Sequence, residues 1–329
     1  MKALQFDSPG LDKLRVVDLP KPKPEAHEVL LRVEMAGVNP VDYSVVTGNF
    51  AKPMPHVPGA EVAGTVEEVG QHVRSLKPGD KVVLYNRVFD GNCDMCASGM
   101  EMECRNGGIM SIVTNGGFAE YMVAPEWNLI KVPEVGWDVA ASLPVAALTS
   151  YHALKVTGVS PGKAVAVIGA SGNTGIFAVQ LAKLMGATVV ALSSKSWLKE
   201  FGADYVSNYS GAKGQVEKAT DGLGVDVVVA TLGAAHVNEA MSWLKAGGKV
   251  VTFGAIGGDE LKLSLSALYG RHLSLVGTTG GTRAELMELA RLSPRLKVKT
   301  WKIYPLAEGA TALSALRSSE RDGRIFIEP

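Results

Sequence analysis

The chain contains 329 residues, of which 47% are hydrophobic and 6% aromatic, and its 33 basic side chains are balanced by 33 acidic ones. A chain of this size can form two domains with separate cores, and its composition excludes disorder and coiled coil. Because the charges cancel and no long run of either sign occurs, we expect neither nucleic acid nor an anionic membrane surface as a partner.

No uninterrupted apolar segment approaches the length of a bilayer span, and the start of the chain, MKALQFDSPG, lacks the basic and apolar regions of a signal peptide. These features predict a cytoplasmic protein whose cysteines are reduced. The chain has only three cysteines and four glutamines, a composition that is typical of thermostable proteins.

The first part of the chain, residues 1–125, is predicted to form a small β-rich domain. Apolar and polar residues alternate in its strand-like segments, and glycine or proline stands at the joints between them. The segments concerned are 28–39, 60–70, 79–86 and 117–125.

From Trp137 onward the pattern changes to helices alternating with fully apolar strands. Residues 140–158 and 175–185 are predicted helices, and the predicted strands are 163–169, 187–192, 225–231, 249–255 and 273–279. Apolar strands that alternate with helices indicate an α/β fold with a doubly wound parallel sheet, here assigned to residues 126–281. The tail, 282–329, contains further helices and strands, and we expect it to complete the first domain.

All three cysteines lie within twelve residues, and Asp90 precedes the first of them by the spacing of a CxxC pair. Three thiolates and one carboxylate can hold a tetrahedral structural zinc and leave no open position on the metal. The predicted metal ligands are Asp90, Cys93, Cys96 and Cys104. Glu101 or Glu103 is an alternative fourth ligand. The alternatives to zinc are a chance cluster of reduced cysteines and a disulfide with one free thiol.

A glycine-rich turn follows the strand 163–169 and opens the helix 175–185. Glycines there allow a sharp turn and a close approach of a pyrophosphate, while the helix N-terminus attracts its negative charge. We therefore predict a dinucleotide site, since a turn without ligand explains this context less well. The candidate cofactor contacts in the turn are Gly169, Ser171, Gly172, Asn173, Thr174 and Gly175.

The end of the second strand of this domain carries Ser193, Ser194 and Lys195. An NAD site usually places a carboxylate at this position, where it binds the ribose 2′-hydroxyl and repels a 2′-phosphate. Two hydroxyls and an ammonium favour a phosphate instead, so NADPH is the predicted cofactor. The alternative is that Lys195 is a solvated surface charge.

Taken in order, several motifs resemble the medium-chain dehydrogenase/reductase superfamily, which contains the zinc-type alcohol dehydrogenases and the quinone oxidoreductases. Besides the cysteine lobe and the glycine turn, they are AGVNPVD at 36–42, VPGAEVAGTVEEVG at 57–70, PGDKV at 78–82, GGFAEYMV at 116–123 and LPVAALTSYHAL at 143–154. The resemblance implies a GroES-like catalytic domain and a Rossmann domain, with the active site between them.

The resemblance also implies that the cysteine lobe is the structural zinc loop of the superfamily, with Asp90 at the first ligand position. The zinc-dependent members carry catalytic ligands where this chain has Asn39, Ala60 and Val145. Since none of these side chains replaces a thiolate or an imidazole, we expect no catalytic zinc. The pattern is then closer to the zinc-free quinone oxidoreductase branch.

In that branch, a lysine and a tyrosine that match Lys195 and Tyr209 contact the 2′-phosphate of NADPH. Thr149 matches a position on the nicotinamide side of the cofactor. Glu61 matches a glutamate that pairs with an arginine near the C-terminus, here Arg324. The remaining candidate cofactor contacts are Phe253, Gly254, Thr278 and Arg324.

Without a metal, hydrogen bonds must stabilise the negative charge that develops on the substrate oxygen. The candidate catalytic residues are Asn39 and Tyr43, although Asn39 also suits a turn cap and Tyr43 a half-buried core aromatic. The leading hypothesis is NADPH-dependent reduction of hydrophobic ketones, α,β-unsaturated carbonyl compounds or quinones, by a homodimer or homotetramer. The alternatives are a ketone/alcohol dehydrogenase that acts on secondary alcohols and a catalytically silent NADPH-binding protein.

Overall fold

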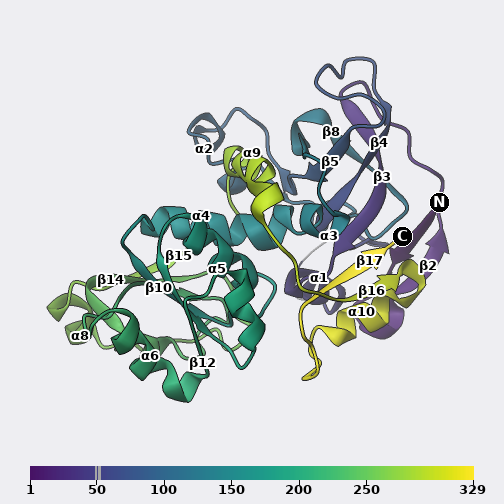
Figure 1. Cartoon of the computed structure of the whole chain (residues 1–329). Helices are drawn as coiled ribbons and strands as arrows, with labels where there is room; N and C mark the ends of the chain where they lie inside the picture. Colours follow the sequence, from purple (N-terminus) through teal and green to yellow (C-terminus); the bar gives the residue numbers. More distant parts are fainter. Residues whose placement is uncertain (49, 51–52) are drawn as a thin grey trace. The chain divides into compact units, whose positions relative to one another are not determined.

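The computed structural model describes residues 1–48, 50 and 53–329. The chain forms two compact units (Figure 1). Unit 1 consists of Met1–Leu148 together with Gly281–Pro329, and unit 2 consists of Thr149–Gly280. The domain boundaries expected from the sequence stay a prediction. Within the described residues, no helix combines the length and the apolar character that crossing a membrane requires.

Unit 2 is built on a parallel sheet, which confirms the sheet predicted from the apolar strands. In the part of the chain that the structure describes, the strand order is β12-β11-β10-β13-β14-β15, and every pairing is parallel. The elements from residue 148 to residue 280 are α4 (Leu148–Thr157), β10 (Ala164–Ile168), α5 (Gly175–Leu184), β11 (Thr188–Leu192), β12 (Tyr205–Ser207), α6 (Ala212–Ala219), β13 (Val225–Ala230), α7 (Val237–Ala240), β14 (Leu244–Thr252), α8 (Leu265–Gly270) and β15 (Ser274–Gly277).

The order of these strands reverses at β10, because β11 pairs with one of its edges and β13 with the other. All five residues of β10 are buried, as expected of a central strand covered on both faces. In open sheets of this kind, ligands bind beyond the carboxyl ends of the strands on either side of the reversal. We therefore expect a ligand site among the residues that follow β10, β11 and β13.

Unit 1 is built on a mostly antiparallel sheet. Among the described residues its order is β16-β17-β3-β4-β5-β9, with β8 also paired to β3. The elements of this unit are β1 (Lys2–Gln5), β2 (Arg15–Asp18), β3 (Glu28–Gly37), α1 (Pro40–Val46), β4 (Glu61–Val69), β5 (Lys81–Leu84), β6 (Arg87–Val88), α2 (Asp94–Ala97), β7 (Gly108–Ile109), β8 (Tyr121–Pro125), β9 (Leu129–Lys131), α3 (Trp137–Ala140), a π-helical turn (Leu143–Ala147), α9 (Arg283–Leu292), β16 (Thr300–Pro305), α10 (Gly309–Ala315) and β17 (Arg324–Glu328).

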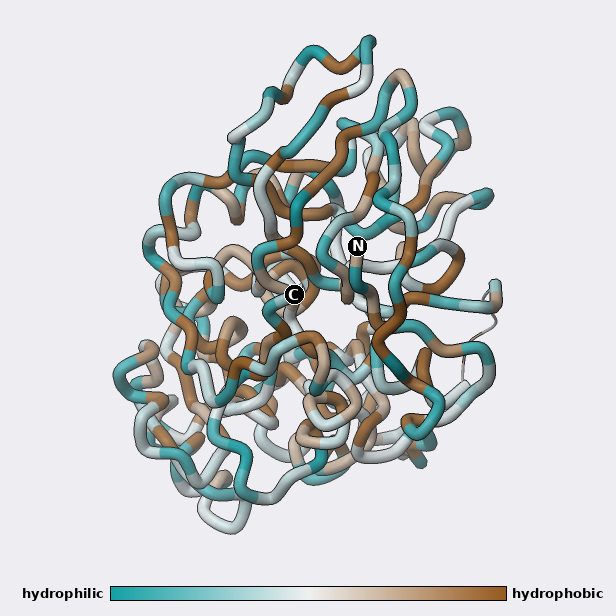
Figure 2. Tube along the Cα trace, turned by 90° about the vertical axis from the view of Figure 1, so that its right-hand side faces the viewer, coloured by the Kyte–Doolittle hydropathy of each residue, from teal (hydrophilic) through white to brown (hydrophobic). Residues whose placement is uncertain are grey.

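The two ends of the chain meet in this sheet. The C-terminal strand β17 pairs antiparallel with β3, so the yellow and purple strands lie side by side in Figure 1. Their buried side chains, including Leu31, Val33, Ile325 and Ile327, form one apolar core. Figure 2 shows hydrophilic residues mainly on the outer loops of the trace.

Candidate functional site

The glycine-rich turn between β10 and α5 has the shape that the sequence predicts. Gly169 has a φ of +69°, a conformation that side chains disfavour. A Cβ at Gly175 would lie 2.1 Å from the carbonyl oxygen of Gly169, so only glycine lets α5 start this close to the strand. A Cβ at Gly172 would meet only that same oxygen, at 3.1 Å, and its surroundings are otherwise open. The turn is thus tight where strand and helix meet and open where a ligand can approach.

The N-terminus of α5 faces this open turn and supplies backbone donors for an anion. Ser171, Asn173 and Thr174 line the turn, and Thr174 is the N-cap residue of α5. The hydroxyl of Ser150 donates to the carbonyl of Thr174 at 2.8 Å and so fixes the start of the helix. The arrangement can hold a pyrophosphate, because donors and the positive end of the helix dipole coincide.

The end of β11 lies beside this turn. The Ser193 hydroxyl donates to the Ser171 hydroxyl at 2.9 Å, and the Lys195 amide donates to Ser193 at 3.2 Å. Ser193 is buried, Lys195 is half-buried and Ser194 is exposed. Of the predicted phosphate cradle, the side chain of Ser193 lies against the glycine turn, Lys195 is joined to Ser193 through its backbone amide, and residues 193–196 contain no carboxylate.

Tyr209, just beyond β12, also reaches the glycine turn. Its hydroxyl accepts a hydrogen bond from the amide of Gly169 at 3.1 Å, and burial raises the pKa of this phenol. The ring stacks face to face on His236, with centroids 3.8 Å apart and planes 3° from parallel. The sequence reasoning missed His236. A signal was present, because a histidine that shortly follows β13 stands near the carboxyl edge of the sheet.

The remaining predicted contacts of unit 2 follow other strands or open α4. Phe253 and Gly254 follow β14, and the amide of Thr278 beyond β15 donates to the carbonyl of Thr252 at 3.0 Å. Within the described residues, the hydroxyl oxygen of Thr278 is buried without a hydrogen-bond partner. Thr149 is nearly buried at the start of α4. Their roles toward a cofactor stay predictions.

In unit 1, Glu61 is a fully buried carboxylate at the start of β4. One of its oxygens accepts from the backbone amides of Val145 and Ala146, at 3.0 and 2.7 Å. These amides belong to the first turn of a helical segment, where a carboxylate satisfies unpaired donors. The guanidinium of Arg324 forms an ion pair with the other oxygen, which confirms the expected partnership of Glu61 and Arg324.

Asn39 is part of the same buried network. Its side-chain amide donates to Glu61 at 2.8 Å and to the carbonyl of Gly37 at 3.3 Å. Asn39 is also the N-cap residue of α1, in a capping box with Asp42. The geometry therefore directs the amide of Asn39 toward Glu61, while a catalytic role for Asn39 stays a prediction.

Asp42 is a second fully buried carboxyl group in this network. It accepts hydrogen bonds from the backbone amides of Asn39 and Ala60, at 2.8 and 2.9 Å. Burial raises the pKa of Asp42 to about 7, and the nearby charge of Glu61 adds to the rise, although backbone hydrogen bonds oppose it. Asp42 therefore changes its charge near neutral pH and ties the loop before β4 to the start of α1.

Tyr43, the other candidate catalytic residue, is half-buried on α1. Arg317 donates a hydrogen bond to its hydroxyl oxygen at 3.2 Å, and the guanidinium lies 5.1 Å from the ring centroid. A hydroxyl that accepts from arginine can still donate its own proton to another oxygen. A catalytic role for Tyr43 as a proton or hydrogen-bond donor stays a prediction.

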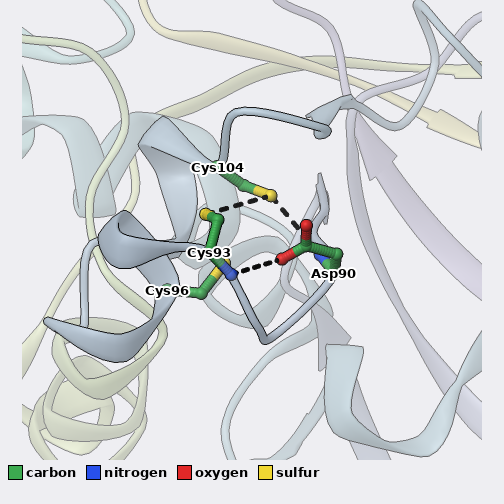
Figure 3. A group of neighbouring side chains, drawn as sticks. All are labelled: Asp90, Cys93, Cys96 and Cys104. Carbon is green, nitrogen blue, oxygen red and sulfur yellow. Dashed lines mark hydrogen bonds between the residues drawn. The ribbon is translucent and has the colours of Figure 1, made fainter.

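The cysteine lobe brings together the side chains predicted to bind zinc (Figure 3). Among the described residues, their ligand atoms form a group in which all lie within 4.8 Å of one another: Asp90, Cys93, Cys96 and Cys104. The sulfur atoms of Cys93 and Cys104 are 3.9 Å apart, and all three cysteines are free thiols, so no disulfide forms here. Two sulfurs bound to one tetrahedral zinc at ~2.3 Å are separated by about 3.8 Å, so this spacing fits the metal.

The local backbone prepares the lobe for a metal. The carboxylate of Asp90 accepts from the amides of Asn92 and Cys93, at 2.9 and 3.1 Å, and from the side chain of Asn106 at 2.6 Å. Backbone hydrogen bonds lower the pKa of the Cys93 thiol, whereas burial raises the pKa of Cys96 to about 12. A bound cation deprotonates such thiols, so the donor set fits zinc. Neither of the alternative ligands, Glu101 and Glu103, belongs to the group.

The comparisons with known proteins agree with this architecture. The model of the alcohol dehydrogenase GroES-like domain matches residues 25–134, and the model of the zinc-binding dehydrogenase family matches residues 174–294. The NAD-dependent alcohol dehydrogenase of Sulfolobus acidocaldarius is 32% identical, and the match covers 100% of this chain and 99% of that protein.

Two further relatives extend the comparison. The chloroplast envelope quinone oxidoreductase homolog of Arabidopsis thaliana is 31% identical, with 100% of this chain and 98% of that protein covered. The solved structure of a cobalt- and zinc-bound thermostable alcohol dehydrogenase from Pyrobaculum aerophilum superimposes with a TM-score of 0.92 at 43% identity, covering 100% of this chain and 99% of that chain.

A β-rich GroES-like unit and a Rossmann unit with a glycine-rich turn together define a two-unit dehydrogenase, which confirms the predicted fold class. The chain belongs to the medium-chain dehydrogenase/reductase superfamily. It is a dehydrogenase or reductase of the alcohol dehydrogenase type.

Proposed function

We propose that the chain is an NADPH-dependent reductase that transfers hydride to hydrophobic ketones, α,β-unsaturated carbonyl compounds or quinones without a catalytic zinc. The observation that carries this proposal is the hydrogen bond from Asn39 to Glu61. Asn39 stands where zinc-dependent relatives carry a cysteine, and its amide is used to hold a buried carboxylate. Ala60 and Val145, at the other two positions, offer no ligand atom in their side chains.

The choice of NADPH is supported by the end of β11. The hydroxyls of Ser193 and Tyr209 form hydrogen bonds to the glycine turn, and the backbone amide of Lys195 donates to Ser193. Hydroxyls and an ammonium group stabilise a phosphate dianion. A carboxylate would repel the phosphate, and residues 193–196, at the end of β11, contain none. His236, stacked on Tyr209, adds a ring whose nitrogen can donate a hydrogen bond.

NADPH, when bound, supplies the hydride. The protein then has to stabilise the charge that develops on the substrate oxygen and to exclude competing reactions. We assign the oxygen contact to Tyr43, whose hydroxyl accepts from Arg317 and can donate its own proton. Asn39 then acts through Glu61 as a positioning residue. Conjugated substrates spread the negative charge onto an enolate oxygen and are easier to reduce by hydrogen bonding alone.

We assign one structural zinc to Asp90, Cys93, Cys96 and Cys104. All four positions of a tetrahedral zinc would be filled by protein atoms, so this metal would stabilise the lobe and take no part in hydride transfer.

We also propose that subunits pair through β15, the edge strand of the parallel sheet. Within the described residues, β15 pairs only with β14, and nearby apolar side chains are exposed, including Leu265 (73%) and Tyr269 (74%) on α8. Exposed strand edges with apolar neighbours commonly serve as pairing surfaces. Sedimentation velocity of a Leu275→Arg variant tests the proposal, with dissociation as the expected result.

The test of the proposed function is NADPH oxidation on a panel that pairs saturated ketones with their enone analogues, before and after exhaustive chelation. We expect faster turnover of the enones, a preference for NADPH over NADH, and retained activity in protein that contains one zinc or less per chain. A second zinc per chain that turnover requires would contradict the zinc-free mechanism.

A second candidate function is oxidation of secondary alcohols with reduction of the corresponding ketones. It is favoured by the name of the Sulfolobus acidocaldarius relative, an NAD-dependent alcohol dehydrogenase. Alcohol oxidation at a rate equal to enone reduction would support this function. Tight NADPH binding without any turnover across the panel would instead indicate a catalytically silent cofactor-binding protein.

A further inference from the structure

Arg87, in β6, is a nearly buried arginine for which the described residues provide no pairing partner. Its side chain is only 7% exposed. In the part of the chain that the structure describes, no hydrogen bond or ion pair reaches its guanidinium. Burial lowers the pKa of Arg87, as expected when a charge loses water without gaining a partner. Burying a charge without a partner costs free energy of folding. A ligand from outside the protein that pairs with the guanidinium would offset this cost.

The backbone that carries Arg87 is held rigidly. The buried side chain of Asn128 donates to the carbonyls of Tyr85 and Arg87, at 2.7 and 2.6 Å. The strand β6 also pairs with β7, where Arg87 lies opposite Ile109. Arg87 is therefore a fixed cation, unlike an arginine on a loose surface loop. At the same time its nitrogens are not among the fully sealed polar atoms, so a ligand or water can reach them.

The register between β4 and β5 shows which end of the sheet the segment before Arg87 approaches. Ala63 in β4 lies opposite Val83 in β5, in an antiparallel pairing. Continued by two residues, this register would bring Tyr85 level with Glu61, the carboxylate that accepts from Asn39. Arg87 follows Tyr85 by two residues and itself lies in the separate two-stranded sheet of β6 and β7.

Glu101 is the alternative partner for this charge. Arg87 and Glu101 both influence the pKa of Tyr85, so the two groups share a neighbourhood. One carboxylate oxygen of Glu101 is buried without a hydrogen-bond partner among the described residues. No ion pair joins the two side chains, however, and besides burial only Tyr85 influences the pKa of Arg87. The positive charge of Arg87 stays available to another anion.

We propose that Arg87 binds a carboxylate of the carbonyl substrate, so that the preferred substrates are short oxo acids and unsaturated oxo acids. This inference rests on the proposed hydride transfer to carbonyl compounds, and within that reaction it makes anionic carbonyl compounds, rather than hydrophobic ones, the preferred substrates. A planar guanidinium binds a carboxylate through two parallel hydrogen bonds and fixes its orientation. For an unsaturated oxo acid, hydride from NADPH would add to the alkene carbon β to the ketone and a proton from water to the α carbon. For a saturated oxo acid, hydride would add to the carbonyl carbon and a proton to its oxygen, and in both cases NADPH would become NADP⁺.

The matched substrates for the test are acetylacrylate, an enone that carries a carboxylate, and its methyl ester. The measured quantity is the ratio of kcat/KM for the acid to that for the ester. Arg87→Met should lower this ratio ~10- to 100-fold, the range expected for a charge-assisted hydrogen-bonded pair, with the loss mainly in KM. Arg87→Lys should restore part of it. Arg15→Met, which removes an exposed arginine of the same unit, is the control and should leave the ratio unchanged.

Equilibrium binding separates this inference from the proposed function. Calorimetry with NADP⁺ present compares levulinate, a saturated oxo acid, with methyl levulinate. If no carbonyl compound turns over but levulinate binds through Arg87, the proposed function fails and the carboxylate site stands. If acid and ester bind equally, or Arg87→Met weakens both alike, the carboxylate site is wrong.

Measurements of thermal stability test whether the role of Arg87 is purely structural. Arg87→Met replaces an unpaired buried charge with an apolar side chain, so its melting temperature should stay equal or rise. If Arg87 instead pairs with Glu101 in solution, Arg87→Met and Glu101→Gln should each lower the melting temperature. In that case neither the native chain nor Glu101→Gln should prefer the acid over the ester. That result would overturn the inference.

Discussion

Two glycines of the turn between β10 and α5 allow stability and cofactor binding to be tested separately. In Gly175→Ala the new Cβ would lie 2.1 Å from the carbonyl oxygen of Gly169 and 2.8 Å from backbone atoms of Ala170. In Gly172→Ala the nearest atom is 3.1 Å away, and the backbone at residue 172 is not left-handed. One substitution therefore forces the backbone apart, while the other needs a shift of only a few tenths of an ångström.

The expected energies follow from these contacts. Overpacking a tight site typically costs ~1–3 kcal/mol, and a backbone clash of this depth belongs at or above the upper end of that range. An alanine that fits its backbone stabilises by about 0.4–1 kcal/mol, because it restricts the unfolded chain. We therefore expect Gly175→Ala to lower the free energy of unfolding by about 3 kcal/mol and Gly172→Ala to change it by less than about 1 kcal/mol.

In Gly172→Ala, NADPH affinity should change although stability does not. The methyl group in Gly172→Ala occupies the side of the turn that a pyrophosphate approaches, so the Kd should rise at least ~10-fold in a protein of normal stability. Urea titration measures the stability, and hydrogen exchange of residues 164–184 shows whether the change is local. NADPH fluorescence gives the Kd. The reasoning fails if Gly175→Ala is as stable as the native chain, or if Gly172→Ala binds NADPH normally.

Three further perturbations test unit 1. Glu61→Gln should destabilise it by ~3–5 kcal/mol in urea titrations, because it leaves the buried charge of Arg324 without its carboxylate; a change below about 1 kcal/mol would contradict this. Asp42 has a pKa near 7 in the folded protein against 3.8 as its ordinary value, so the folded state holds an extra proton between these limits. Stability should therefore fall as the pH rises from about 4 to about 7, and Asp42→Asn should flatten this slope by about one proton. Chelation should remove one zinc per chain and lower the melting temperature, and Asp90→Asn should weaken zinc retention whereas Asp94→Asn should not.

The sequence predicted those parts of the fold that leave a local pattern. The strands β10, β11 and β13 are apolar runs bounded by glycine or polar turns, and each formed where it was expected. The strand β12, Tyr205–Ser207, was missed, because its three half-buried residues at the sheet edge show no apolar run. Helix 140–158 was also predicted as continuous, whereas Leu143–Ala147 forms a π-helical turn before α4.

The π-helical turn illustrates why features that depend on long-range contacts could not be predicted from the sequence. Glu61 accepts hydrogen bonds from the amides of Val145 and Ala146, more than 80 residues later in the chain. A contact of this kind depends on how the sheet presents Glu61, so no local periodicity reports it. Arg87 and His236 escaped notice for the same reason. Arg87 is notable because its guanidinium lacks a partner among the described residues, and His236 because it stacks on Tyr209. Both features depend on the folded structure.

Zinc-dependent relatives carry catalytic ligands at three positions, which in this chain are Asn39, Ala60 and Val145. Each of these residues donates a hydrogen bond to a buried carboxyl group. The side chain of Asn39 and the amide of Val145 both donate to Glu61, and the amide of Ala60 donates to Asp42. Two buried carboxyls thus hold the three positions in place by hydrogen bonds. A lone Asn39→Cys substitution would remove one side-chain donor from this network, whereas Ala60→His would remove none, because the donor there is the backbone amide. Either substitution would add only one of the ligands that a zinc needs. The zinc-free proposal therefore depends on the whole network, and Glu61 is the group whose loss tests it most directly.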